Sequence, residues 1–156
     1  MAAFDYVKPA SLESFINDLA QVRSEGAILA GGTDLLVQIR AGLVSRKVLF
    51  DVNNLEEMHG ISDQGDSVWI GAAVRIVDVA ESSLIQNAIP CLSLATIQLG
   101  SPQIRNRATL GSNILRPLHR LVKITTFCNS WNNNLANSST MSSGVLFRNK
   151  KSMKIV

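Results

Sequence analysis

The sequence predicts an α+β fold, and three features of the chain support this prediction. A chain of 156 residues with 46% hydrophobic residues is long enough to bury a core. Its first 52 residues alternate between short apolar runs and segments with helical spacing. The residues after them are typical of a hairpin followed by short helices. The alternation by itself fits an α/β or an α+β arrangement of layers.

The first part of the chain predicts the order strand, helix, strand, helix, strand. After a short strand at "FDYV", a helix is expected from the spacing of Leu12, Phe15, Ile16, Leu19 and Val22, with Ser11 as N-cap and Gly26 as the stop. Residues 27–30 predict a strand buried on both faces. The stretch "TDLLVQIRAG" predicts a second helix, which Gly42 ends, and "KVLFDV" closes the unit as another buried strand.

The second part predicts a hairpin and several helices. A single helical turn is expected in "NNLEEMHG", before two strands, "GISD" and "SVWIGA", joined at "QGD". Helices are predicted over residues 76–80, 83–86 and 90–99. The stretch "GSPQIRNRA" is predicted as a loop and "TLGSNI" as a short strand, and no element is predicted beyond residue 113. Phe50 and Trp69 are expected in the core, and His59 and His119 in surface or capping positions.

Charge and cysteine content exclude several functions. The net charge of +3 comes from the last 42 residues, because the first 114 carry eight basic and 12 acidic groups, a net of −4. With no basic stripe in that body, nucleic-acid binding is not expected. No apolar run is long enough to span a membrane and no secretory signal is visible, so we expect no membrane contact and a cytoplasmic location. Cys91 and Cys128 stand far apart, which argues against a zinc site, an iron–sulfur cluster or a disulfide framework.

The stretch "AILAGGTDLL" raises the question of an anion site. Where a strand ends and a helix begins, consecutive backbone N–H groups and the helix dipole favour a phosphate. Gly31 and Gly32 would allow close approach, Thr33 could add its hydroxyl, and Asp34 could instead bind helix N–H groups or a ribose-like hydroxyl. A tight turn without a ligand is the alternative. Neither GxGxxG nor GxxxxGK[ST] is present, so a Rossmann site and a P-loop are not supported.

A second stretch, "RATLGSNI", predicts another turn of small and polar residues. Thr109, Gly111, Ser112 and Asn113 could bind an anion or the edge of a flavin, although an ordinary turn is again the alternative. Two such turns could hold one diphosphate.

Together these motifs carry a resemblance to a known family. "AILAGGTDLLVQIRAG", "VWIGAAVRIVDV" and "GSPQIRNRATLGSNI" resemble the FAD-binding medium subunit of the molybdenum hydroxylases, the xanthine dehydrogenase and carbon monoxide dehydrogenase family, over residues 4–114. The resemblance implies the N-terminal part of the two-subdomain FAD-binding fold of the vanillyl-alcohol oxidase and molybdenum hydroxylase type. It implies subdomains at residues 1–58 and 59–114, and a divergent basic tail, disordered or frameshifted, at residues 115–156.

The resemblance also assigns cofactor-binding residues, but no catalytic residue and no metal ligand. The first set wraps the FAD diphosphate: Ile28, Leu29, Ala30, Gly31, Gly32, Thr33, Asp34 and Leu35. The second set contacts the cofactor from the other motif: Thr109, Leu110, Gly111, Ser112 and Asn113, with Leu99 and Gly100 near the flavin.

Two departures from the family pattern stand out. Ser112 replaces a usual glycine, and if that position needs a positive φ, the serine would cost about 1 kcal/mol or more. After "GSNI" the sequence resembles none of the family's continuation, so we expect a frameshift or a truncation near residue 114.

The function that the resemblance implies is electron transfer in a hetero-oligomer. FAD would receive electrons from a partner 2Fe-2S subunit, fed by a molybdenum-cofactor subunit that hydroxylates a substrate such as xanthine or another purine. FAD would then pass the electrons to NAD or another acceptor. The alternative is a truncated, non-catalytic remnant or interaction module that no longer binds flavin.

Overall fold

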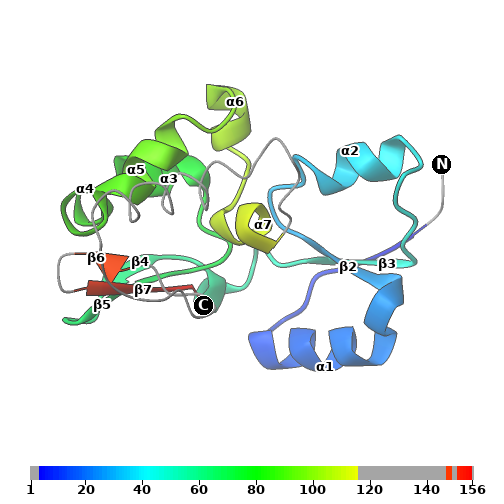
Figure 1. The fold of residues 1–156 in the computed structure, drawn as a ribbon. Helices are drawn as coiled ribbons and strands as arrows, with labels where there is room; N and C mark the ends of the chain where they lie inside the picture. The colour runs from blue at the N-terminus through cyan, green and yellow to red at the C-terminus, as the bar shows by residue number, and fades with distance from the viewer. Residues whose placement is uncertain (1–3, 116–146, 149–150, 156) are drawn as a thin grey trace.

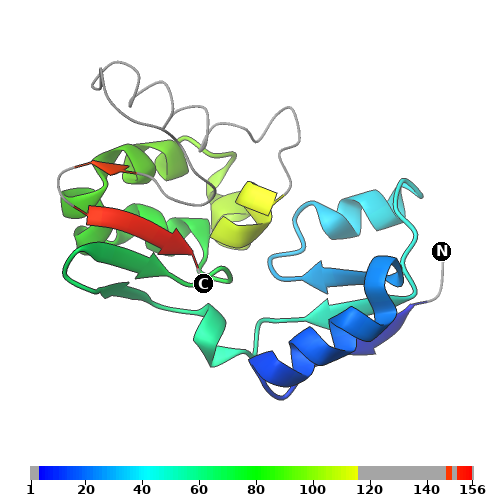
Figure 2. The same cartoon turned by 60° about the horizontal axis from the view of Figure 1, so that its bottom comes forward.

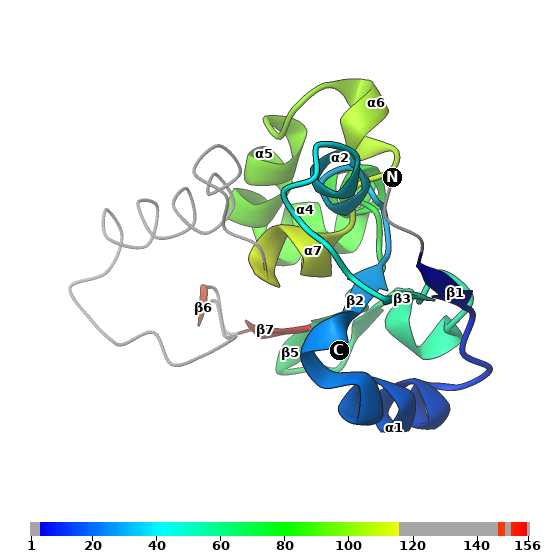
Figure 3. The same cartoon turned by 90° about the vertical axis from the view of Figure 1, so that its right-hand side faces the viewer.

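The computed structural model describes residues 4–115, 147–148 and 151–155, and it contains two sheets (Figure 1). The first sheet has three strands, β1 (Asp5–Val7), β3 (Val48–Asp51) and β2 (Gly26–Leu29), in that spatial order, and all are parallel. Helix α1 (Leu12–Val22) covers one face and α2 (Leu35–Arg40) the other, as the view in Figure 3 shows. The predicted order of strand, helix, strand, helix, strand is therefore confirmed.

Helix α1 begins as predicted and ends differently. Ser11 caps it with a reciprocal capping box, in which the Ser11 hydroxyl accepts from the Ser14 N–H at 3.1 Å. Phe15 then packs edge-on against Phe50 of β3, with ring centroids 5.8 Å apart. The prediction of Gly26 as the stop is wrong, because Arg23 ends the helix at φ 50° and Gly26 starts β2 at φ −84°. A Cβ at position 26 would lie 3.1 Å from the Phe50 ring, so packing favours glycine there.

The second sheet has the spatial order β4 (Ile61–Asp63), β5 (Ser67–Ile70), β7 (Lys151–Ile155) and β6 (Phe147–Arg148). The predicted hairpin is confirmed, because β4 and β5 pair antiparallel through a turn at Gly65, whose φ is +77°. β7 lies parallel to β5, although no element was predicted in that part of the chain.

Helices cover one face of this second sheet (Figure 2). α3 (Ile76–Glu81), α4 (Ser83–Ala88) and α5 (Pro90–Ile97) match the three predicted helices, and their apolar side chains pack with β5 in the largest core cluster. The 3-10 turn Glu56–Met58 confirms the helical turn expected between the two sheets. None of the helices in the described segments is long and apolar enough to cross a bilayer.

Four further expectations are wrong. The loop at "GSPQIRNRA" contains α6 (Pro102–Arg105), which starts because Ser101 caps it and a proline fits the first turn. The "strand" at "TLGSNI" is α7 (Leu110–Leu115), preceded by a single bridge between Thr109 and Arg75. Such short apolar runs do not distinguish a strand from a helix. Trp69 is 39% exposed and Ile28 is 41% exposed, so Trp69 is not a core residue and β2 is not buried on both faces. Phe50 is buried, as expected.

Replacing Ser11 with Ala should lower the free energy of unfolding by about 1 kcal/mol, because the first turn of α1 loses its cap. Denaturant unfolding followed by circular dichroism measures the change. Ser11→Gly is the control, since glycine at an N-cap costs only a few tenths of a kcal/mol. Equal losses in the two variants would contradict a capping role.

Candidate functional site: a two-motif cofactor pocket

The Gly31–Gly32 pair joins β2 to α2, and the two glycines are needed for different reasons. Gly32 has φ +71°, a conformation that other residues adopt only with strain. Gly31 has no positive φ, but a Cβ on it would collide with the Arg107 carbonyl and lie 2.9 Å from the Ala108 Cα. The main chain at Gly31 therefore packs directly against the main chain that leads into the second motif.

The second motif is fixed in place by backbone hydrogen bonds. Ala108 O accepts from Ile76 N at 2.9 Å, Leu110 N donates to Val74 O at 2.9 Å, and Gly111 N donates to Ala72 O at 2.9 Å. A Cβ at Gly111 would lie 2.8 Å from the Ala72 Cβ and carbonyl oxygen, so glycine is required by close approach there too. The two sequence motifs, far apart along the chain, thus meet at one place between the two sheets, where Figure 1 shows α7.

The loop after β2 offers backbone donors to a ligand. Within the described part of the chain, no hydrogen bond is recorded for the N–H groups of Gly31, Gly32 and Thr33. Consecutive free N–H groups next to a glycine pair are a common way to bind a phosphate. The loop therefore retains the donors that a diphosphate needs.

Asp34 does not fill one of its two expected roles, which was to bind the helix N–H groups. It occupies the N-cap of α2, but its side chain makes no capping bond; its carboxylate accepts from the Gln38 amide at 2.9 and 3.0 Å. The carboxylate is thus positioned on the first turn of α2 beside the pocket rather than on the helix N–H groups.

The polar side chains of the second motif face one another and leave one acceptor open. The Thr109 hydroxyl donates to the Ser112 hydroxyl at 3.0 Å, and the Asn113 amide donates to the Thr109 carbonyl at 2.9 Å. Asn113 Oδ1 is buried and has no partner among the described residues. A buried acceptor without a donor is costly, and a bound hydroxyl or N–H group would satisfy it.

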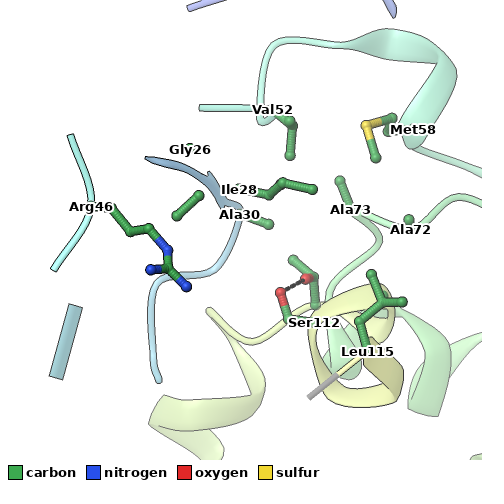
Figure 4. Close-up of a pocket in the computed structure, with 13 residues that line it drawn as sticks. Gly26, Ile28, Ala30, Arg46, Val52, Met58, Ala72, Ala73, Ser112 and Leu115 are labelled. Atoms are coloured by element: carbon green, nitrogen blue, oxygen red, sulfur yellow. Dashed lines mark hydrogen bonds between the residues drawn. The ribbon is translucent and has the colours of Figure 1, made fainter. Parts of the chain in front are cut away.

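The expected strain at Ser112 is absent. Ser112 lies within α7, and Arg23 is the one non-glycine residue with a positive φ among those described. A helical φ suits serine without strain, so the cost expected for this substitution does not arise. The Ser112 side chain lies at the cavity and is shown in Figure 4.

Two adjoining cavities occupy this junction. The smaller, of about 40 Å³, is lined by residues of both motifs: Ile28, Ala30, Gly32, Thr33, Asp34, Leu35, Ser112 and Asn113. The larger, of about 260 Å³, shares Ile28, Ala30 and Ser112 with it and adds Thr109 and Gly111 from the predicted set. The structure therefore brings ten of the predicted residues to these two cavities, the larger of which is drawn in Figure 4.

The remaining predicted residues lie elsewhere. Leu29 packs beside the core on the α2 side, Gly31 supports the loop from behind, and Leu110 is fully buried in the core of the second part. Leu99 is buried in that same core and Gly100 forms the turn before α6, and neither lines a cavity. Their contact with the flavin stays a prediction.

Several lining residues were missed by the sequence analysis. Arg46, Val52 and Met58 come from segments without a motif, and Ala72 and Ala73 come from the stretch "VWIGAAVRIVDV", to which no site role was assigned. Only the folded chain brings these residues to the larger cavity. Arg105, a basic residue between the motifs, does not line either cavity and donates to the carbonyls of Leu99 and Gly100 at 3.2 and 3.0 Å.

A polar network supports the start of the glycine loop. The Asn53 amide donates to the Ala30 carbonyl at 3.1 Å and to Asp51 Oδ1 at 2.6 Å, and the Tyr6 hydroxyl donates to the other oxygen of Asp51. His59 Nε2 lies 3.0 Å from the Asn53 carbonyl, in line with the capping position expected for it. The network ties β1, β3 and the end of β2 together directly before Gly31.

The same network sets the pKa of Asp51. Burial raises the pKa of this carboxyl group, but the Tyr6 hydroxyl and the two Asn53 donors, with the charge of Lys8, lower it by more. The pKa of Asp51 therefore lies below its usual range, and the hydrogen bond to Asp51 raises the pKa of Tyr6. The ionised carboxylate is the form that the fold favours.

The donors, the open acceptor and the bare backbone at two glycines fit a flavin dinucleotide: free N–H groups for a diphosphate and Asn113 Oδ1 for a hydroxyl or N–H of the cofactor. A β-α-β unit with such a loop, closed by a second motif from another subdomain, defines a flavin-nucleotide-binding domain. The chain belongs to the family described as the FAD binding domain in molybdopterin dehydrogenase, whose model matches residues 2–144. FAD, the cofactor predicted from the sequence, is the one that this description names.

Two curated relatives support this family assignment. The chain is 34% identical over 111 residues to the carbon monoxide dehydrogenase medium chain of Hydrogenophaga pseudoflava, covering 71% of this chain and 39% of the relative. It is 38% identical over 110 residues to the xanthine dehydrogenase FAD-binding subunit of Escherichia coli O157:H7, covering 70% and 37%. The chain thus spans about two fifths of the length of these relatives.

Solved structures agree on the fold. Carbon monoxide dehydrogenase from Hydrogenophaga pseudoflava superposes with a TM-score of 0.70 at 34% identity, over 72% of this chain and 39% of that one. Quinoline 2-oxidoreductase from Pseudomonas putida 86 gives 0.69 at 31% identity over the same shares. The expected fold class, the N-terminal part of the two-subdomain FAD-binding fold, is therefore confirmed.

Replacing Gly31 with Ala should separate the two motifs, because the new methyl group needs the space of the Arg107–Ala108 main chain. We expect a loss of stability larger than the roughly 1 kcal/mol that a positive φ costs in the control Gly42→Ala, where φ is +72° and no atom lies within 4 Å. Amide hydrogen exchange at Leu110 and Gly111 should speed up in Gly31→Ala alone. Unchanged exchange there would contradict the direct backbone contact.

Replacing Tyr6 with Phe should lower stability at neutral pH more than at acid pH. Because the pKa of Asp51 is lowered in the folded chain, its carboxylate contributes stability at pH values above its ordinary pKa of 3.8. This contribution is lost as the pH falls through the folded pKa. Urea unfolding at pH 7 and near pH 3 measures the difference between the variant and the parent chain. A difference that stays constant across this range would rule out the Tyr6 to Asp51 hydrogen bond as its source.

Proposed function

We propose that this chain forms the FAD-diphosphate-binding part of an electron-transfer subunit of a molybdenum hydroxylase. The observation that carries the proposal is the meeting of the Gly31–Thr33 loop and the Thr109–Asn113 segment at adjoining cavities. Neither motif alone offers both free backbone donors and an open buried acceptor. FAD, when bound, supplies the redox chemistry, since it can take up and release electrons.

The chain's own residues bind and orient the cofactor in this proposal. The N–H groups of Gly31, Gly32 and Thr33 hold the diphosphate, and Asn113 Oδ1 accepts from a hydroxyl or N–H group of the cofactor. The Asn53 bond to the Ala30 carbonyl fixes the entry to the loop, so less of the binding energy is used in ordering it. No residue of this chain is assigned a proton-transfer or covalent role.

The wider role is proposed from the relatives. In it, a 2Fe-2S subunit delivers electrons from a molybdenum-cofactor subunit to the flavin, and NAD or another acceptor removes them. Xanthine or another purine is the proposed substrate of the molybdenum subunit, and the cytoplasm is the proposed location. The family of this chain and the names of its relatives, among them a xanthine dehydrogenase subunit, support this arrangement.

The first test is whether the purified 156-residue chain binds FAD. Visible absorbance of the protein, and flavin fluorescence of the supernatant after denaturation, should show bound FAD in the parent chain. Gly32→Val should lose it, because valine is strained at φ +71° and its Cβ would lie 2.9 Å from the Leu36 Cδ1.

Gly65→Val is the matched control for this experiment. Gly65 has φ +77°, lies in the β4–β5 hairpin, and has no atom within 4 Å of the added Cβ. We expect it to lose stability but to retain FAD. A parent chain that takes up no added FAD would refute the proposal, and equal binding by Gly32→Val and the parent chain would refute the role of the loop.

The electron route needs a separate test in the assembled complex. Co-expression with candidate molybdenum-cofactor and 2Fe-2S subunits from the same source should give a complex in which substrate reduces the flavin and lowers its visible absorbance. Adding NAD should restore the colour if NAD is the acceptor. Flavin that stays oxidised with purine substrate would exclude purines as the electron source.

A further inference from the structure

The larger cavity runs along the full length of one strand. Its lining includes Gly26, where β2 begins, and Ala30, which follows its end. The opposite wall comes from the second part of the molecule, through Met58, Ala73 and Leu115, as Figure 4 shows. The cavity is therefore an elongated, mostly apolar space that continues from the diphosphate loop toward the start of β2.

β2 presents free main-chain groups to this cavity. It is an edge strand, because the order β1-β3-β2 leaves one of its sides without a neighbour. Leu29 O accepts from Val52 N and Glu25 O accepts from Lys47 N, so by the alternation of a parallel pair the N–H and C=O of Ile28 point away from β3. No hydrogen bond to either group of Ile28 is recorded in the described ranges.

Arg46 supplies the one charge among the residues that line this cavity. Its guanidinium makes one recorded hydrogen bond, from Nη1 to the Ser45 carbonyl at 3.1 Å, and it takes part in neither of the two salt bridges found in the described residues. The neighbouring Lys47, by contrast, pairs with Glu25 at 2.6 Å. Arg46 thus keeps most of its donors for a ligand.

Arg46 and the glycine loop lie at opposite ends of β2. The residue after Arg46, Lys47, donates its N–H to the carbonyl of Glu25, which directly precedes β2, whereas the loop follows the other end of β2. At about 3.3 Å per residue, the five steps from Gly26 to Gly31 span roughly 16 Å. A ligand anchored by its diphosphate at the loop can therefore place a group attached to that diphosphate beside Gly26 and Arg46.

We propose that Arg46 is a further cofactor-binding residue, which binds the adenosine half of the dinucleotide in the cavity along β2. Adenine carries a hydrogen-bond donor next to an acceptor, which complements the free C=O and N–H of Ile28. The apolar side chains of Met58 and Val52 line the same space. The planar guanidinium of Arg46 can donate to a ring nitrogen or stack on the purine face. The inference rests on the proposed function, since it assigns a subsite to the same cofactor.

The test compares ligands that contain and lack adenosine. The full chain, freed of flavin, is titrated with FAD, ADP and FMN by calorimetry, in the parent form and as Arg46→Gln. We expect the Kd for FAD and for ADP to rise about tenfold in the variant, as for the loss of one hydrogen bond to a charged group, and the Kd for FMN to stay unchanged. Arg40→Gln is the control, because it removes the same charge from the exposed end of α2, away from both cavities.

The outcomes separate this inference from the proposed function. If the parent chain binds neither FAD nor ADP, the proposed function itself fails. If the parent chain binds FAD and Arg46→Gln binds FAD and ADP equally well, the function stands and the assignment of Arg46 is overturned. An equal loss for FMN, or for Arg40→Gln, would also overturn it. Thermal unfolding of the flavin-free variants, expected to match the parent chain, excludes a general loss of fold.

Discussion

The contact between the Gly31 main chain and the Arg107–Ala108 main chain determines how the site is assembled. Each of the two parts of the molecule has its own core, and a side chain at residue 31 would push these two backbones apart. Because the second motif begins directly after Ala108, the glycine brings the donors of one subdomain next to the polar side chains of the other. The cavities, and the binding of any ligand that fills them, depend on this close contact between the two main chains.

The polar network behind the loop also holds the loop in place. Asn53 bonds the Ala30 carbonyl, Asp51 holds Asn53, and Tyr6 and Lys8 keep Asp51 ionised. The loop is therefore fixed on one side by hydrogen bonds and on the other by backbone contact. Preorganisation of this kind leaves the free N–H groups in place before a ligand arrives.

The elements of the first 100 residues could be predicted because local signals agree with the fold. The apolar spacing of α1, the capping box at Ser11 and the buried strand at β3 all indicate the same structure that packing then stabilises. The errors in the type of element concern segments of six residues or fewer, namely α6 and α7, where apolar periodicity is too short to separate a helix from a strand or a loop. Trp69 and Ile28 were misplaced because burial depends on what lies across a sheet face or edge, which sequence alone does not show.

The site could be predicted only where a motif marks it. Glycines 31, 32 and 111 are visible in the sequence because they require unusual backbone positions, and the structure confirms close approach or a positive φ at each. Arg46, Met58 and Asn53 have no such signal, since a basic residue before a strand or a methionine in a turn is common in any protein. Their involvement follows from tertiary placement alone.

The separation of the two cores has a consequence for folding. The apolar cluster around β5 and α5 and the cluster around Phe15 and Phe50 share no buried residue, and the two parts of the molecule meet at the glycine contact and the cavity walls. A ligand held by both walls binds the assembled state and not the separated one, and mass action then stabilises the interface as well as the site. The cofactor of such a domain is also part of its architecture, because a cofactor held by both walls raises the free energy needed to separate the two parts.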